Sequence, residues 1–205
     1  MIDRFTILHV CTGNIGRSPM AEYLMRLHLT HRLSAQSNVY EVSSAGTSGC
    51  TASPMEPFAL LALSAKGVDG SDFHARELTE DMIASADLVL TATIEHRADV
   101  VTMVPAAVRR TFALREFARL ASLAVDEPAV TAIPERPAGE PDLVAMSRAV
   151  VEKLGPLRGA VHRPLPGDDD LIDPLGAPSS VYAVRADEID IACRQVVALL
   201  TADHH

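Results

Sequence analysis

The stretch 5-FTILHVCTGNIGRSPMAEYL-24 passes from an apolar run, through a turn that contains glycine, into a helical pattern. The run from Phe5 to Val10 is typical of a buried parallel strand. From Ser18 onward, apolar residues recur at helical spacing, and Pro19 falls in the first turn, where its missing N–H costs nothing. The stretch therefore predicts a strand, a tight loop over 11–18, and a helix.

Downstream, short apolar runs alternate with helical patterns. We expect strands over 39–44 and 88–90, and a weaker strand around Thr111 and Phe112. Ser53 and Glu56 form a capping-box pattern before a helix that extends through Ala65, and 79-TED-81 starts another helix. This alternation predicts an α/β fold with a parallel sheet, helices on both faces and right-handed crossovers. A ligand should bind at the carboxyl edge of such a sheet.

The second half of the chain carries three more helical stripes and a proline-rich segment. Residues 123–141 combine four prolines with acidic side chains and predict a surface excursion within a single domain. A loop rich in Asp, Pro and Gly is expected over 164–176. The expected helix-core positions are Ile94, Ala98 and Val101; Leu143, Met146, Val150 and Leu154; and Ile189, Ala192, Val196 and Leu199.

Charge and cysteine content exclude several classes of protein. The net charge of -9 would repel nucleic acid and anionic membranes, so neither is an expected partner. No run approaches the roughly 18 apolar residues that a membrane span needs, and we expect a cytoplasmic location. Cys11, Cys50 and Cys193 lack CxxC spacing, which predicts neither a disulfide framework nor a zinc site.

The loop after the first strand has the composition of an anion cradle. Successive backbone N–H groups ahead of a helix N-terminus surround one point, and Asn14 tolerates the left-handed conformation that such a nest requires. The same partial charges favour the thiolate form of Cys11, which would then be a nucleophile. Arg17 supplies a planar fork for two phosphoryl oxygens. The expected phosphate-binding residues are Thr12, Gly13, Asn14, Ile15, Gly16, Arg17 and Ser18.

An inert strand-end cysteine beside a surface arginine is the structural alternative. Cys-x5-Arg-Ser alone would arise by chance in roughly one or two chains per hundred. The strand before it, the glycines and Asn14 within it, and Ser18-Pro19 at the helix start make the functional interpretation the stronger one.

These residues resemble the low-molecular-weight protein tyrosine phosphatases, and bacterial members in particular. The loop of that family is Cys-x5-Arg-Ser, with Gly-Asn inside and Ser-Pro after it. The resemblance extends over nearly the whole chain apart from the excursion, through the stretches 43-SSAGTSG-49, 75-ARELT-79, 86-ADLVL-90 and 173-DP-174.

The resemblance implies a single phosphatase domain over 1–205, built as a flavodoxin-like or Rossmann-like three-layer sandwich. It implies a four-stranded parallel sheet with the phosphate loop after the first strand. It also implies metal-independent hydrolysis of phosphomonoesters through a phosphocysteine, without a cofactor. Cys11, Arg17 and Asp173 are then the catalytic residues, and Asn14, Ser18 and Ser44 support the loop.

A proton donor for the leaving oxygen is required in this chemistry, because a thiolate attacks without a proton. Asp173 is the candidate, since Pro174 stiffens its loop. Asp168, Asp169 and Asp170 precede it and could form a metal site. We consider solvated carboxylates the better interpretation, because no His or Glu partner is spaced for coordination.

Four positions depart from the family pattern. Gly16 stands where relatives commonly carry a second, protective cysteine. Leu175-Gly176 and Gly49-Cys50 stand where tyrosine-specific relatives carry aromatic walls. Phe73 aligns with a supporting histidine, and His74 follows it. Ile15 is typical of phosphotyrosine-directed members, whereas those resembling phosphoarginine phosphatases carry threonine.

The expected substrate is therefore a phosphotyrosine-containing protein or a small aryl phosphate. The alternatives are a phosphoarginine phosphatase, an arsenate reductase that uses an external thiol, and a phosphate-binding module without catalysis. Retention of Cys11, Arg17 and Asp173 together argues against the last. The oligomeric state is not predicted.

Overall fold

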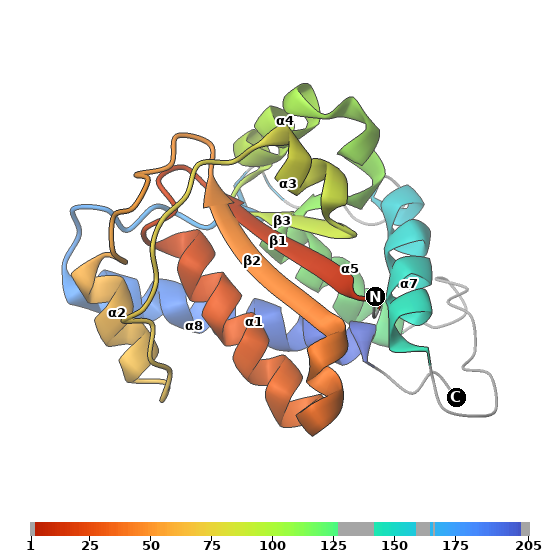
Figure 1. The fold of residues 1–205 in the computed structure, drawn as a ribbon, viewed down its shortest axis with the longest axis horizontal. Coiled ribbons are helices and arrows are strands. Elements are labelled where there is room, and N and C mark those ends of the chain that lie inside the picture. The colour runs from red at the N-terminus through yellow and green to blue at the C-terminus, as the bar shows by residue number, and fades with distance from the viewer. Residues whose placement is uncertain (1–2, 127–141, 159–164, 166, 202–205) are drawn as a thin grey trace.

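The sheet of the computed structural model has four parallel strands in the order β2-β1-β3-β4 (Figure 1). The structure describes residues 3–126, 142–158, 165 and 167–201. The strands are β1 (Phe5–Cys11), β2 (Tyr40–Gly46), β3 (Leu88–Thr91) and β4 (Thr111–Ala113). Each lies where the sequence predicts a strand, and the α/β prediction is confirmed.

Helices cover both faces of this sheet. On one face lie α1 (Arg17–Leu33), α5 (Leu114–Asp126) and α8 (Ser179–Leu200), with α2 (Pro57–Ser64) packed against α8. On the other lie α3 (Glu80–Ser85), α4 (Ile94–Met103) and the short 3-10 helix η2 (Pro105–Arg110). A second 3-10 helix, η1 (Ser34–Val39), joins α1 to β2, and α7 (Leu143–Leu157) stands at the sheet margin beside η2 (Figure 1).

The alternation of side chains along β1 divides the core between these faces. Phe5, Ile7 and Cys11 belong to the cluster that contains α1, α5 and α8, whereas Leu8 and Val10 belong to the cluster that contains α3 and α4. Because β1 lies inside the sheet, both of its faces are buried, which explains its continuous apolar run.

Two helix predictions were wrong in detail. Ser53 does not cap α2; Glu56 does, and its carboxylate accepts from the N–H groups of Phe58 and Ala59. The stripe Ile94, Ala98 and Val101 does not face the core, because α4 buries His96 and Val100 instead. The side of α4 that is buried therefore differs from the side that the apolar stripe predicted.

The sequence interpretation also missed α5. This helix buries Phe117, Leu120 and Ala121 against α8, and it contains residues 123–126, with which the expected excursion begins. The rest of that segment, 127–141, lies outside the described residues. Within the described part of the chain, every helix is too short or too polar to cross a lipid bilayer.

Candidate active site

The loop over 11–18 follows the carboxyl end of β1. Its carbonyl groups accept hydrogen bonds from neighbouring segments, which hold the loop in place. Backbone N–H groups of Thr47, Ser48, Cys50 and Glu56 donate to the carbonyls of residues 11, 12, 13 and 15, at 2.8 to 3.0 Å. Among the described residues, no protein group accepts from the N–H groups of residues 13–16. These four donors are available to an anion, as the cradle prediction requires.

Gly46, at the end of β2, allows this approach of the two segments. A Cβ atom on Gly46 would lie 2.4 Å from the carbonyl oxygen of Thr12 and 2.9 Å from the backbone nitrogen of Asn14. Contacts this short are repulsive, so any side chain would push the loop away from β2. A glycine is therefore required where β2 ends.

Asn14 fixes the conformation of the loop from within. Its backbone is left-handed, with a φ of 55°, and its side chain is fully buried. The amide nitrogen donates to the hydroxyls of Ser18 (2.9 Å) and Ser44 (2.8 Å), and the amide oxygen accepts from the backbone N–H of Arg76 at 2.9 Å. The supporting roles expected of Asn14, Ser18 and Ser44 thus have a geometric basis.

Glu22 extends this support into α1, and the sequence interpretation did not identify it. The Ser44 hydroxyl donates to its carboxylate at 2.6 Å, and Arg26 pairs with the other carboxylate oxygen at 2.6 Å. Burial, opposed mainly by Arg26, raises the pKa of Glu22. A glutamate between the buried residues Met20 and Leu24 was the available signal, because carboxylates are rarely buried without partners.

The expected nucleophile lies inside the loop. The Cys11 sulfur lies 2.9 Å from the Ser18 hydroxyl oxygen. That oxygen already accepts from Asn14, so its own proton is free for the sulfur. Cys11 is almost fully buried and lines a cavity of about 210 Å³, together with Gly13, Ile15 and Gly16. The sulfur and the unpaired N–H groups of these three loop residues thus belong to one cavity.

Arg17 joins this loop to the expected proton donor. Its Nη1 donates to the carbonyl of Leu171 at 3.0 Å, and its Nη2 donates to the carboxylate of Asp173 at 2.5 Å. The other Asp173 oxygen accepts from the N–H of Leu175. The Asp173 side chain is about half exposed, with a relative accessibility of 48%. Residues 156 positions apart thus meet at one cavity.

The segment before Asp173 is anchored at several points. The N–H of Leu171 donates to the carbonyl of Ala92, and the Asp170 carboxylate accepts from the N–H of Ile94 at the start of α4. Asp169 forms an ion pair with Arg119 of α5 at 2.9 Å. The interpretation of these carboxylates as solvated was wrong for Asp169, which is nearly buried in its ion pair. Among the described residues, no group of three or more His, Cys, Asp and Glu side chains could hold a metal ion.

Residues that the sequence interpretation did not assign also line the cavity. Tyr182 of α8 and Glu56 face it, and burial, followed by the Glu56 carboxylate, raises the pKa of Tyr182 to about 12. Cys50 lines it too, which places a free thiol in the same cavity as Cys11. His74, by contrast, is exposed, and Phe73 is buried against Tyr23.

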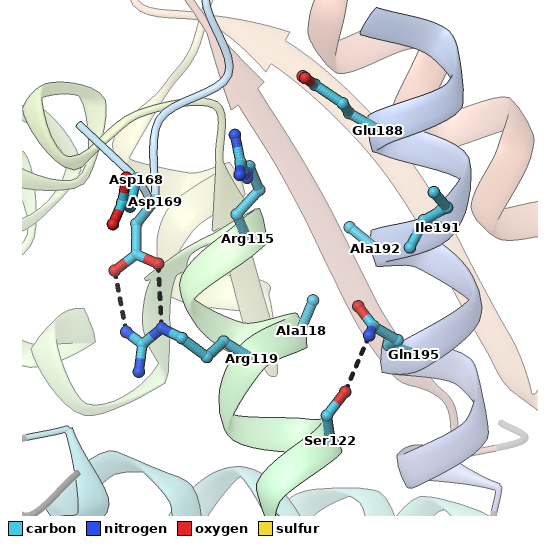
Figure 2. A pocket seen from close by; sticks show the side chains of 10 residues that line it. All are labelled: Arg115, Ala118, Arg119, Ser122, Asp168, Asp169, Glu188, Ile191, Ala192 and Gln195. Carbon is cyan, nitrogen blue, oxygen red and sulfur yellow. Dashed lines mark hydrogen bonds and ion pairs between the residues drawn. The ribbon is translucent and has the colours of Figure 1, made fainter. Parts of the chain in front are cut away.

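A larger hollow of about 550 Å³ lies elsewhere, between α5 and α8 (Figure 2). Arg119 of α5 extends away from α8 to reach Asp169, and Gln195 of α8 donates to Ser122 of α5. Neither Cys11 nor Asp173 lines it. This hollow therefore borders the back of the segment that carries Asp173, whereas the smaller cavity holds the reactive groups.

Comparison with known proteins agrees with this geometry. The family model described as "Low molecular weight phosphotyrosine protein phosphatase" matches residues 6–155. A probable low molecular weight protein-tyrosine-phosphatase, EpsP of Ralstonia nicotianae, is 34% identical over 111 residues, which are 54% of this chain and 71% of the relative. A protein-arginine-phosphatase of Geobacillus stearothermophilus is 34% identical over 113 residues, 55% of this chain and 71% of the relative.

The fold is also found among solved structures. The structure of the YwlE arginine phosphatase from Geobacillus stearothermophilus superimposes with a TM-score of 0.66 and 24% sequence identity. The superposition covers 98% of this chain and 97% of that one. At this identity the likeness concerns the arrangement of the sheet and helices.

Proposed function

This chain belongs to the low molecular weight phosphotyrosine protein phosphatase family, and from that premise we propose that Cys11, Arg17 and Asp173 hydrolyse phosphotyrosine in proteins. The observation that carries the proposal is the meeting of the Cys11 sulfur, the unpaired N–H groups of the loop, and the Arg17–Asp173 pair at one cavity.

The first step transfers the phosphoryl group to sulfur. The Cys11 thiolate attacks phosphorus in line, the bond from phosphorus to the phenolic oxygen breaks, and Asp173 gives its proton to that oxygen. Arg17 and the loop N–H groups bind the three equatorial oxygens, where negative charge is concentrated. The Ser18 hydroxyl holds the sulfur in place.

The second step releases phosphate. Asp173, now a carboxylate, accepts a proton from a water molecule while the water oxygen attacks phosphorus and the phosphorus–sulfur bond breaks. The electron pair returns to sulfur, which Ser18 stabilises by donating a hydrogen bond. A metal ion is not required in either step, because Arg17 and the backbone supply the positive charge.

The ion pair between Arg17 and Asp173 has a part in this cycle. A phosphate in the loop competes with Asp173 for Nη2 of Arg17, because both are anionic acceptors for the same donor. Nη1 remains held by the Leu171 carbonyl during this exchange. Substrate binding thereby frees Asp173 from Arg17, and the carboxylate takes up from solvent the proton that it gives to the leaving oxygen.

Phosphotyrosine is the favoured substrate because the cavity is lined by apolar groups that suit a phenyl ring. Ile15, Pro174, Leu175 and the ring of Tyr182 all line it. Phosphoarginine is the second candidate, since a relative of similar identity is named a protein-arginine-phosphatase. Ile15 favours the first substrate, because its side chain offers no hydrogen bond to a guanidinium group.

A comparison of three variants tests the mechanism. Hydrolysis of an aryl phosphate without added metal should be abolished in Cys11→Ser, and kcat should fall by about two to three orders of magnitude in Asp173→Asn. Asp168→Asn, a change of the same chemistry in the same loop, is the matched control and should stay within about twofold of wild type. Turnover that survives in Cys11→Ser would remove the thiolate mechanism.

Substrate preference is tested at Ile15. We expect wild type to hydrolyse a phosphotyrosine peptide at least about tenfold more efficiently than a phosphoarginine peptide, and Ile15→Thr to reduce that ratio, because a hydroxyl can pair with the guanidinium. A wild-type preference for phosphoarginine would favour the second candidate. Thiol-dependent arsenate reduction without phosphatase turnover would instead support the arsenate reductase alternative.

We further propose that the protein works in the cytoplasm. Cys11, Cys50 and Cys193 are all free thiols, which fits a reducing compartment.

Cys193 is fully buried with its sulfur toward the carbonyl of Ala21, and burial raises its pKa strongly. It is thus unsuited to resolve an oxidised Cys11, which argues against a reductase with an internal cysteine relay.

A further inference from the structure

His96 lies in the first turn of α4, on the other face of the sheet from α1. Its ring nevertheless contacts the phosphate loop. Its side chain is nearly buried, at 7% exposure. Nε2 lies 2.8 Å from the Thr12 hydroxyl, and Nδ1 lies 2.6 Å from the Thr93 hydroxyl. Both ring nitrogens therefore have partners, one in the loop and one at the cap of α4.

The bonding partners of Thr12 and His96 fit one assignment of the protons in the series Arg17, Thr12, His96. The Arg17 guanidinium can only donate, so the Thr12 oxygen accepts from Nη2, at 3.4 Å. The proton of the Thr12 hydroxyl is then available to Nε2 of His96. Burial and, second, the Arg17 charge lower the pKa of His96, which favours the neutral ring. A neutral ring accepts at one nitrogen and donates at the other, so with Thr12 as the donor Nε2 is the acceptor. Nδ1–H in turn donates to Thr93.

Arg17 is thus held on both arms of its fork. Nη1 donates to the Leu171 carbonyl, and Nη2 touches both Asp173 and Thr12. When phosphate displaces Asp173 from Nη2, Thr12 is the protein group that still fixes that nitrogen. Its orientation depends on the bond to His96, because a threonine hydroxyl otherwise rotates freely.

We propose that His96 is a positioning residue for catalysis, which acts through the Thr12 hydroxyl to hold the Arg17 guanidinium in the plane that receives the phosphoryl oxygens. The inference rests on the proposed phosphatase function and adds to it a residue from α4. If His96 had a purely structural role, it would act on Thr93 and not on Thr12. The Thr93 hydroxyl also accepts from the backbone N–H of His96 and caps α4.

Two amide variants separate these roles. In His96→Gln the amide oxygen can take the place of Nε2 and accept from the Thr12 hydroxyl. In His96→Asn the amide takes the place of Nδ1 and reaches only Thr93. Both remove the ring. We expect His96→Asn to lower kcat for an aryl phosphate by roughly tenfold with little change in KM, the effect of about one lost hydrogen bond to a charged site. His96→Gln should recover most of that loss.

A double-mutant cycle with Thr12→Val tests the connection. Thr12→Val alone should lower kcat by a factor similar to that of His96→Asn, and adding His96→Asn to it should cost less than about twofold more. His74→Asn, a change at an exposed histidine, serves as the matched control and should leave kcat unchanged. The melting temperature of each variant reports folding separately from activity.

Two results would overturn the inference. One is equal loss in the Gln and Asn variants at unchanged melting temperature. The other is a full additional tenfold loss when His96→Asn is added to Thr12→Val. Neither outcome bears on the thiolate mechanism, which is tested separately by the loss of hydrolysis in Cys11→Ser.

Discussion

Asn14 combines two properties that few residues supply together. Its left-handed backbone costs an ordinary side chain roughly 1–2 kcal/mol, whereas asparagine adopts this conformation more readily. Its amide bonds Ser18, Ser44 and the backbone of Arg76 at once, so the loop is tied to α1, β2 and the segment before α3. The single side chain therefore links the cradle to three parts of the scaffold.

Glycine and alanine at position 14 should separate these properties. Both variants lose the amide bonds, so kcat/KM should fall by at least about tenfold in each. Only Asn14→Ala also carries the left-handed strain, so it should be less stable than Asn14→Gly by about 1 kcal/mol in urea denaturation. Unimpaired turnover in Asn14→Gly would show that the backbone alone keeps the loop competent.

At the scale of elements, the segment 168–173 depends on α5, the helix that the sequence interpretation missed. Arg119 binds both oxygens of Asp169, at 3.3 and 2.9 Å (Figure 2). Arg115 donates to the carbonyl of Asp170. Asp169 is itself nearly buried. Removal of Arg119 leaves a buried carboxylate without its partner, which destabilises this conformation of the loop.

We therefore expect Arg119→Met to weaken proton donation by Asp173 without affecting the attack by sulfur. Phenyl phosphate, whose leaving group needs a proton, should be hydrolysed several-fold more slowly. A nitrophenyl phosphate, whose leaving group is stable as an anion, should be affected less. Ser122→Ala, in the same hollow but away from the loop, should change neither rate. Equal slowing of both substrates by Arg119→Met would show that the pair does not act through Asp173.

The elements that sequence analysis predicts are those with a strong local signal. β1 and the loop after it combine an uninterrupted apolar run with glycines and Asn14, and both lie where expected. In α5 the buried apolar residues also recur at three- and four-residue spacing, but the charged residues Arg115, Glu116 and Arg119 interrupt the apolar pattern. Because prolines follow, the start of the predicted loop was placed inside the helix.

The candidate site divides in the same way. The loop residues and Asp173 belong to motifs that can be read from the sequence. Glu22 and His96 do not, because their roles come from contacts across the fold, with Ser44 and Thr12 respectively. For α4 the hydrophobic stripe misled the interpretation, since the buried face contains a histidine that is satisfied by hydrogen bonds and not by apolar packing.

At the scale of the whole molecule, His9 makes stability depend on pH. It lies in the middle of β1 with 1% exposure, and neither ring nitrogen has a hydrogen-bond partner among the described residues. Burial and, second, the charge of Arg26 lower its pKa from 6.5 to about 3. The folded protein therefore keeps this ring neutral under conditions in which the unfolded chain protonates it.

The sign of the effect follows from proton binding. Between pH 6.5 and 3 the unfolded state holds a proton at His9 that the folded state lacks, so the free energy of unfolding falls as the pH is lowered. The slope is about 1.4 kcal/mol per pH unit once the pH is well below the unfolded value. Above pH 7 both states are neutral at this position and the effect vanishes.

His9→Leu removes this proton site and fills a similar volume in the strand. The quantity to measure is the free energy of unfolding of His9→Leu minus that of wild type, in urea. This difference should be about 2 kcal/mol larger at pH 5.0 than at pH 7.5, since pH 5.0 lies about 1.5 units below the unfolded pKa. Carboxylates titrate in both proteins and cancel in the difference. Ile7→Val, on the same strand, is the matched control: it should destabilise by about 1 kcal/mol at both pH values. A difference between His9→Leu and wild type that stays constant across this range would mean that His9 binds its proton equally well in the folded state, through a partner such as a buried water.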